Sequence, residues 1–327
     1  MTGVFRPGDR VQLTGHKGRR NTITLVPGGV FHTHRGTLEH ALLLGQPDGS
    51  VVTGSDGTQY LALKPLLTDY VMSMPRGAAI VYPKDAGQIL AEADVALGHR
   101  VVEAGVGSGA LTLWLLRAVG ELGSVHSVER RQEFADVAAD NVAGFFGGTP
   151  ERWTLTTGDL AEVLDAGEPD AYDRAVLDML APWEVVPAVS RALEPGGVVV
   201  AYIATVPQLS RVVEALREAG SFTEPLSTET MVRGWHVDGL AVRPDHRMIA
   251  HTGFLVTARR LADGVTAPPR RRRPAKGAHP ETEGTAPEDT RVLSEANDAA
   301  DGPALAEADS ADRAGGSRPL TEPGSDA

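Results

Sequence analysis

The sequence predicts an α/β fold, in which a mostly parallel, doubly wound sheet is covered by helices and preceded by a small β domain. Three observations predict it. Strand-like and helix-like segments alternate from about residue 74 to residue 260. A glycine-rich turn joins the first of these strands to its helix. Residues 1–73 hold only short β-type runs, separated by turns rich in Pro, Asp and Gly.

Length and composition set the expected domain organisation. A chain of 327 residues has room for about two domains. Every Phe, Tyr and Trp precedes residue 261, and residues 262–327 hold 8 basic and 13 acidic residues with no Ile. Such a segment buries too little apolar surface to offset its ordering entropy. We therefore expect a β domain at 1–73, a catalytic domain at 74–261 and a disordered acidic tail at 262–327.

Several protein classes are excluded by composition. The chain has no Cys, so it has no disulfide, thiolate zinc site or cysteine nucleophile. It has no apolar run long enough to span a membrane and no signal-peptide pattern, so we expect a cytoplasmic protein. The net charge of −12 argues against nucleic-acid binding, which usually needs a basic footprint.

The expected elements follow from hydrophobic periodicity and turn residues. In the first domain, we expect antiparallel strands at 10–13, 22–26, 50–53 and 59–63. In the second, we expect strands at 100–103, 124–129, 153–157, 174–178, 198–204 and 253–258. Helical spacing predicts helices at 110–119, about 131–146, from Pro182 onward, and 207–219.

The glycine loop from Glu103 to Ala110, which reads EAGVGSGA, is the strongest chemical signal. Its glycines let the backbone approach a ligand, and the following helix offers free N–H groups. Three interpretations are open. Gly105-x-Gly107-x-x-Ala110 fits a dinucleotide fingerprint, and Gly105-x-Gly107-x-Gly109 fits an S-adenosylmethionine site. In the third interpretation the loop is only a tight strand-to-helix turn.

Acidic residues end four consecutive strands: Glu103, Glu129, Asp159 and Asp178. Ligands of open α/β sheets bind at this edge. A carboxylate at Glu103 would repel a pyrophosphate but suit an ammonium and a sulfonium. Glu129 is placed for a ribose diol in either case, and Asp159 with Leu160 suits an adenine. One such residue alone is often a helix cap, but four together favour S-adenosylmethionine over a dinucleotide.

These residues resemble those of the tRNA (adenine-N1)-methyltransferase family, whose members methylate adenine 58 of the T-loop. The resemblance also rests on Tyr82-Pro83-Lys84-Asp85, on Pro182-Trp183 after Asp178, and on the segments 233–246 and 251–255. It covers nearly all of residues 1–260 and leaves out the tail. The glycine loop alone is common to many methyltransferases, whereas the other segments are more specific.

The resemblance implies a class I S-adenosylmethionine-dependent methyltransferase fold (Rossmann-like), a homotetramer, and tRNA as partner. It implies catalytic roles for Asp178 and Tyr202, with Tyr82 and Gln88 near the base pocket. It implies cofactor contacts for Gln88, Glu103, Gly105, Val106, Gly107, Ser108, Gly109, Ala110, Leu111, Glu129, Phe134, Asp159, Leu160 and Asp178.

The residues after Asp178 favour attack by adenine N1. Met179-Leu180-Ala181-Pro182 departs from the Asn/Asp-Pro-Pro-Tyr pattern of exocyclic-amine methyltransferases. Adenine N1 needs no deprotonation, and an Asp178 carboxylate that accepts a hydrogen bond from the N6 amino group would orient the base. The base must leave its stack, and Tyr202 is a candidate to stack on it.

Alternatives remain open. One is an NAD(P)-dependent oxidoreductase on the same sheet, and another is a catalytically inactive RNA-binding subunit, against which the intact loop argues. The run from His16 to Arg20 suits either tRNA phosphates or a solvated turn. We expect no metal at His32, His34 and His40, which lack a carboxylate pattern. The run Arg270 to Arg273 either touches RNA or is screened by the tail.

Overall fold

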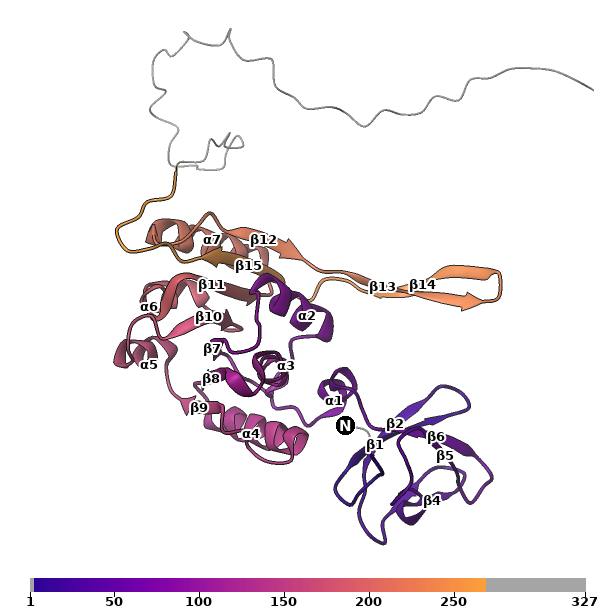
Figure 1. Ribbon diagram of the computed structural model, residues 1–327. Helices are drawn as coiled ribbons and strands as arrows, with labels where there is room; N and C mark the ends of the chain where they lie inside the picture. Colours follow the sequence, from indigo (N-terminus) through magenta and orange to yellow (C-terminus); the bar gives the residue numbers. More distant parts are fainter. Residues whose placement is uncertain (1–2, 269–327) are drawn as a thin grey trace, which may run out of the picture. The chain divides into compact units, whose positions relative to one another are not determined.

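The computed structural model describes residues 3–268 of the chain (Figure 1). The predicted tail from residue 269 onward and the run Arg270 to Arg273 lie outside the described residues. None of the helices within residues 3–268 combines the length and the hydrophobicity that a membrane crossing requires.

The N-terminal part is built of short antiparallel strands around a small apolar core. Its main sheet has the order β2-β1-β6-β5, formed by β1 (Arg10–Gly15), β2 (Arg20–Thr24), β5 (Ser50–Thr53) and β6 (Gln59–Leu63). A second pair consists of β3 (Val30–His32) and β4 (Thr37–Glu39), followed by the 3-10 turn η1 (His40–Leu42). The four predicted strands are confirmed, whereas the β3–β4 pair was not expected. Phe5, Leu13 and Leu43 are among the residues that fill the core.

A seven-stranded sheet forms the centre of the larger part, in the order β12-β15-β11-β10-β7-β8-β9. Its strands are β7 (Arg100–Ala104), β8 (Ser124–Glu129), β9 (Trp153–Thr157), β10 (Tyr172–Leu177), β11 (Leu193–Ile203), β12 (Leu226–Glu229) and β15 (Phe254–Arg259). Strands β7 to β11 run parallel, β15 pairs antiparallel with β11, and the edge strand β12 pairs antiparallel with β15. The chain order reverses between β7 and β10, where sheets of this class bind ligands.

Helices cover both faces of this sheet because its strands bury apolar side chains alternately on each face. Val101 of β7 packs in one core and Val102 in the other. The first core takes α1 (Leu67–Ser73), α2 (Pro83–Glu92), α3 (Ala110–Val119) and α4 (Gln132–Phe146), with the turn η2 (Gly120–Leu122) after α3. The second takes η3 (Pro182–Val185), α5 (Leu160–Ala166), α6 (Val186–Ala192) and α7 (Val206–Ala219). The predicted doubly wound fold is confirmed.

The helix α1 bears on the division into domains, which we expected after residue 73. Leu67, Tyr70 and Val71 pack in the core of the seven-stranded sheet, whereas the N-terminal core ends with Ala62. The division into two domains stays a proposal, and the packing of α1 places this helix with the second domain.

A long hairpin of β13 (Val232–Asp238) and β14 (Ala241–Ile249) pairs only with itself among the described strands (Figure 1). Nearly every residue of it is exposed, and Trp235, Val237 and Leu240 are apolar. Because a two-stranded ribbon is marginally stable in water, this surface is unusual for a stable monomer.

Candidate active site

A cavity of about 590 Å³ lies at the carboxyl ends of β7, β8 and β10. Its lining includes Gly105 and Gly107 of the glycine loop, Glu129 at the end of β8, Leu160 at the start of α5, and Asp178 after β10. The predicted site residues that lie at the switch point of the sheet are therefore brought to one cavity.

Gly105 lets β7 and β10 end side by side. Its φ is +83°, and a Cβ on it would lie 1.6 Å from the carbonyl oxygen of Asp178. The Asp178 N–H donates to the carbonyl oxygen of Ala104 at 2.9 Å, which extends the strand pairing by one residue. A side chain at position 105 would push Asp178 out of the cavity wall, so the glycine is required by close approach as well as by its backbone angle.

Glu129 ties the glycine loop to the next helix. Its carboxylate accepts hydrogen bonds from the Gly107 N–H at 3.0 Å and from the Arg131 N–H at 3.1 Å. The residue is 5% exposed and still lines the cavity. These bonds hold one negative charge at a defined position beside the loop.

Asp178 supplies a second carboxylate to the same cavity. Burial, together with the negative charge of Glu129, raises the pKa of its carboxyl to about 7. A positively charged ligand between the two carboxylates would lower this pKa and favour the ionised form. Arg130 and Arg131 also line the cavity. A cationic group is therefore favoured beside Glu129 and Asp178, not in the cavity as a whole.

Glu103 lies elsewhere than expected, because its side chain points into the core beside α3. It is 1% exposed, and its Oε2 accepts hydrogen bonds from the hydroxyls of Thr112 and Ser127, both at 2.7 Å. Its Oε1 has no hydrogen-bond partner within residues 3–268, and desolvation raises its pKa to about 7. Ala104, the next residue on the strand, lines the cavity instead. Strand alternation turns the Glu103 carboxyl away, so a direct contact with a ligand stays a prediction.

Asp159 caps α5 rather than lining the cavity. It accepts a hydrogen bond from the Ala161 N–H at 2.9 Å and pairs with Arg130. The hydrogen bond from Arg130 holds the pKa of the Asp159 carboxyl below its ordinary value. Its neighbour Leu160 does line the cavity. Of the two residues predicted to hold an adenine, one therefore lines the cavity and the other caps α5.

The remaining loop side chains pack beneath the cavity. Val106, Ala110 and Leu111 are buried in the core. The hydroxyl oxygen of Ser108 accepts hydrogen bonds from the N–H groups of Gly77 and Ala78 at 3.1 and 3.2 Å. Gly109, with φ +78°, precedes the first residue of α3. The loop thus presents mainly backbone to a ligand.

Phe134 lies on α4 beside the 77–79 segment. The Arg131 guanidinium lies 3.6 Å from its ring centroid, and a Cβ on Gly77 would come within 2.9 Å of the ring. Ala78 and Ala79 line the cavity, but Phe134 itself is not part of the lining. Its predicted contact with adenine stays a prediction.

Tyr202 is the second-last residue of β11 and lies outside the cavity lining, near the charges of Asp85 and Asp178. Its hydroxyl donates to the carbonyl oxygen of Thr252 at 2.9 Å, and its ring fills the space that a side chain at position 253 would take. Burial raises the pKa of its hydroxyl to about 12, and the charges of Asp85 and Asp178 act in the same direction. The phenol therefore stays protonated in this environment.

A buried ion pair beside Tyr202 was not given a role by sequence reasoning. Lys84 and Asp85 start α2, and their side chains are only 4% and 2% exposed. The Lys84 ammonium donates to Asp85 Oδ1 at 2.6 Å, to Thr252 Oγ1 at 2.6 Å and to the Thr230 carbonyl oxygen at 2.7 Å, which uses all three of its protons. Thr252 in turn donates to Asp85 Oδ2 at 2.5 Å.

This network, Lys84–Asp85–Thr252, joins α2 to both ends of the β13–β14 hairpin. Thr230 precedes the hairpin and Thr252 follows it. The signal in the sequence was the adjacent pair Lys84-Asp85, but nothing local indicated that a residue 167 positions away would complete it.

Gln88 of α2 and Tyr82, just before that helix, lie outside the cavity lining. Gln88 donates to Glu92 Oε1 at 3.0 Å, and Glu92 accepts hydrogen bonds from Thr228 and Thr257 at 2.7 Å each. Tyr82 is the residue before α2. Among the described residues, no group of three or more His, Asp or Glu side chains is arranged to hold a metal ion.

Two protein families match the chain. One, described as TrmI-like N-terminal, matches residues 3–52, and the other, described as the tRNA methyltransferase complex GCD14 subunit, matches residues 60–247. Together they cover nearly all of the N-terminal sheet and the seven-stranded sheet except β15.

Characterised relatives are similar over most of their length. The tRNA (adenine(58)-N(1))-methyltransferase TrmI of Thermus thermophilus is 38% identical over 248 residues, which are 76% of this chain and 95% of the relative. The tRNA (adenine(57)-N(1)/adenine(58)-N(1))-methyltransferase TrmI of Methanocaldococcus jannaschii is 33% identical over 236 residues, 65% of this chain and 82% of the relative.

Two solved structures share the fold. The SAM-dependent O-methyltransferase of Thermotoga maritima superposes with a TM-score of 0.74 at 31% identity, over 83% of this chain and 97% of its own. The tRNA (m1A58) methyltransferase TrmI of Aquifex aeolicus superposes with a TM-score of 0.69 at 25% identity, over 79% and 99%. The fold is therefore that of a class I methyltransferase, and the chain belongs to the GCD14/TrmI family of tRNA methyltransferases.

Proposed function

We propose that this protein transfers a methyl group from S-adenosylmethionine to N1 of adenine 58 in the T-loop of tRNA. The observation that carries the proposal is Asp178, a carboxylate at the switch point of the sheet, beside the glycine loop and with a pKa raised by burial. The relatives that are 38% and 33% identical carry this activity in their names.

The cavity fits the cofactor by the chemistry of its walls. S-adenosylmethionine carries a sulfonium and an ammonium, which suit the carboxylates of Glu129 and Asp178. Phosphates beside these two carboxylates would be repelled, but Arg130 and Arg131 also line the cavity. The oxidoreductase alternative is therefore disfavoured mainly by the methyltransferase relatives. When bound, the cofactor supplies an electrophilic methyl group.

We assign the cofactor to the backbone of Gly105 and Gly107, to Glu129, and to Leu160, all of which line the cavity. Glu103, Ser108 and Asp159 act behind this layer, since their side chains bond to the protein itself.

Asp178 and Tyr202 are the proposed catalytic residues. The ionised Asp178 carboxylate accepts a hydrogen bond from the adenine N6 amino group, orients N1 and offsets the positive charge that develops on the ring. The hydroxyl of Tyr202 is held by Thr252, so its ring has a fixed position for contact with the base. Neither step needs a proton removed from N1.

We also propose a homotetramer that works on tRNA in the cytoplasm. The β13–β14 hairpin supports it, because its exposed Trp235, Val237 and Leu240 form an apolar surface that a second copy of the chain would cover. Sedimentation of a Trp235→Ser/Val237→Ser variant should show a smaller assembly than Leu122→Ser, which removes an exposed apolar side chain elsewhere. Equal sedimentation of the two would contradict this role of the hairpin.

The activity is tested by methyl transfer to unmodified tRNA. Full-length protein is incubated with tritium-labelled S-adenosylmethionine, and the methylated nucleotide is mapped by nuclease digestion and mass spectrometry. The expected product is 1-methyladenosine at position 58, with none formed on a transcript in which that adenine is replaced. Methylation at another position, or of N6, would refute the proposal.

A further inference from the structure

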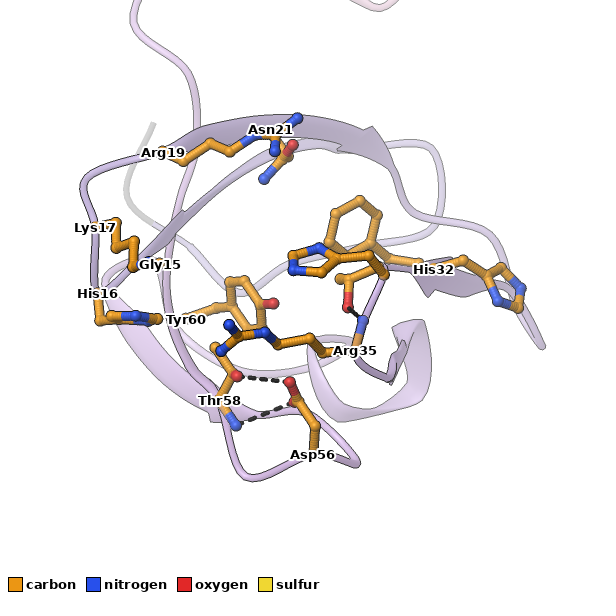
Figure 2. Close-up of a pocket in the computed structure, with 13 residues that line it drawn as sticks. Gly15, His16, Lys17, Arg19, Asn21, His32, Arg35, Asp56, Thr58 and Tyr60 are labelled. Carbon is orange, nitrogen blue, oxygen red and sulfur yellow. Dashed lines mark hydrogen bonds between the residues drawn. The ribbon is translucent and has the colours of Figure 1, made fainter.

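A second hollow, of about 540 Å³, opens in the N-terminal β domain (Figure 2). It lies between the turn that joins β1 to β2 and the turn that joins β3 to β4, with Tyr60 of β6 between them. The size is within the range of small-molecule sites. The proposed methyl transfer uses none of its residues.

Its rim is basic although the chain is acidic. Lys17, Arg19 and Arg35 line it, against the single carboxylate of Asp56. Asp56 is occupied, because its oxygens accept hydrogen bonds from the Thr58 N–H at 3.1 Å and the Thr58 hydroxyl at 2.7 Å. Within residues 3–268, no carboxylate forms an ion pair with Lys17, Arg19 or Arg35.

The structure separates the basic run at 16–20 into two parts. Arg20 turns away and pairs with Asp69 of α1 at 3.0 Å. Lys17 and Arg19 line the hollow, and Figure 2 shows Lys17 near His16 and Arg19 near Asn21. Only these two cations of the run are therefore free to hold an anion at the rim.

The floor of the hollow is aromatic. Tyr60 is 8% exposed and meets Phe31 edge to face, with ring centroids 6.3 Å apart. Gly15 lies opposite Tyr60 in the β1–β6 pairing, and a Cβ there would sit 3.5 Å from the Tyr60 ring. Because position 15 has no side chain, one edge of the Tyr60 ring reaches the hollow although the residue as a whole is buried. The Tyr60 hydroxyl forms no hydrogen bond with any residue of the described part.

We propose that this hollow binds one unpaired nucleotide of the RNA substrate. Its phosphate lies at Lys17 and Arg19, and its base contacts Tyr60 and Phe31. Cations beside aromatic rings that a base can reach are the combination that recognises single-stranded or looped RNA. Here the half-buried Phe31 offers more ring surface than the buried Tyr60. The rim is open on the protein surface, so the strand can continue on both sides of the bound nucleotide. The inference rests on the proposed function and adds a second contact point for its tRNA.

The test compares three variants of the full-length protein. Lys17→Ala/Arg19→Ala removes two positive charges from the exposed turn between β1 and β2. Gly15→Val covers the Tyr60 ring edge without changing the charge. The control, Arg6→Ala, removes an exposed arginine that does not line the hollow. Fluorescence anisotropy with labelled unmodified tRNA gives the dissociation constant from 50 to 200 mM salt. Thermal unfolding checks that each variant is folded.

The double variant should bind tRNA about tenfold more weakly, with a salt slope smaller by roughly 1.5 from two lost phosphate contacts. Gly15→Val should weaken binding by about tenfold with an unchanged slope, because it removes a stacking contact. For both, KM for tRNA rises while kcat and the affinity for S-adenosylhomocysteine stay as in the wild type. A photo-crosslink from the RNA should map to the peptide with Tyr60 or Phe31.

Two results would overturn the inference. One is a dissociation constant for both variants within twofold of Arg6→Ala. The other is tight binding of free 5′-AMP at the hollow that tRNA does not displace, which would assign the site to a mononucleotide. Loss of tRNA binding in the variants together with methylation at another position would leave the hollow in place and refute only the proposed function. Methylation of adenine 58 together with unchanged tRNA binding by both variants would support the proposed function and refute the inference about the hollow.

Discussion

The cavity at the strand ends and the hollow of the N-terminal domain carry opposite charges and hold them differently. Glu129 in the cavity is 5% exposed and has two backbone N–H partners. Lys17 and Arg19 at the hollow lie on an exposed turn and form no ion pair with a described residue. Buried, hydrogen-bonded charges keep a fixed geometry, whereas exposed cations mainly attract a polyanion. The net charge of −12 is a sum over the whole chain, so it does not show that one surface is basic.

The largest expected difference between the two sites is in turnover. Asp178→Ala should lower kcat by about a thousandfold, because it removes a contact that orients the base and offsets charge in the transition state. Its affinity for tRNA should be unchanged, since binding depends on the basic surface. Single-turnover methylation and anisotropy measure the two effects. Turnover within a few-fold of the wild type would remove Asp178 from the mechanism.

The second difference is in stability. Lys84→Met leaves the Asp85 carboxylate buried without its cation, which should lower the free energy of unfolding by about 3 to 4 kcal/mol. Lys17→Ala, on an exposed turn, should change it by less than about 0.5 kcal/mol. Urea denaturation measures both. Adding Asp85→Asn to Lys84→Met should recover part of the loss, and equal losses for Lys84→Met and Lys17→Ala would contradict the role of the buried network.

The smallest expected effect concerns the pH dependence of stability at Glu103. Its folded-state pKa of about 7 lies above the ordinary value of 4.5, so the folded state holds this proton more tightly than the unfolded state. The carboxyl therefore lowers stability progressively as pH rises from about 4.5 to 7, by at most about 3 kcal/mol. Glu103→Gln cannot ionise, so the stability difference between variant and wild type should increase over this range. A difference independent of pH would show that Glu103 stays ionised in the fold.

The local elements were well predicted because their signals are local. The strand expected at 153–157 is β9, and the helix expected at 110–119 is α3. The glycine loop and the acidic strand ends located the cavity, since the carboxyl ends of parallel strands meet at one edge.

Long-range pairing was harder to predict. The strand expected at 253–258 was assigned to a mostly parallel sheet, and β15 joins its edge antiparallel. The sequence predicts no strands at the β13–β14 hairpin, which enters the sequence analysis only as part of the segment 233–246 that carries the resemblance. Its residues are exposed on both faces and lack the alternation of a half-buried strand.

By itself, the amino-acid sequence determined the alternation of elements, the glycine turn and the class of ligand, because each depends on neighbouring residues and their period. Only the tertiary structure decided which charges face a ligand. The Glu103 carboxyl points into the core, where it accepts a hydrogen bond from Thr112. Lys84 donates to Thr252, which is 168 positions away in the sequence. Arg20 pairs with Asp69, whereas Lys17 and Arg19 line the hollow. Side-chain direction and burial depend on contacts between distant segments, and these contacts determine whether a charge serves stability or binding.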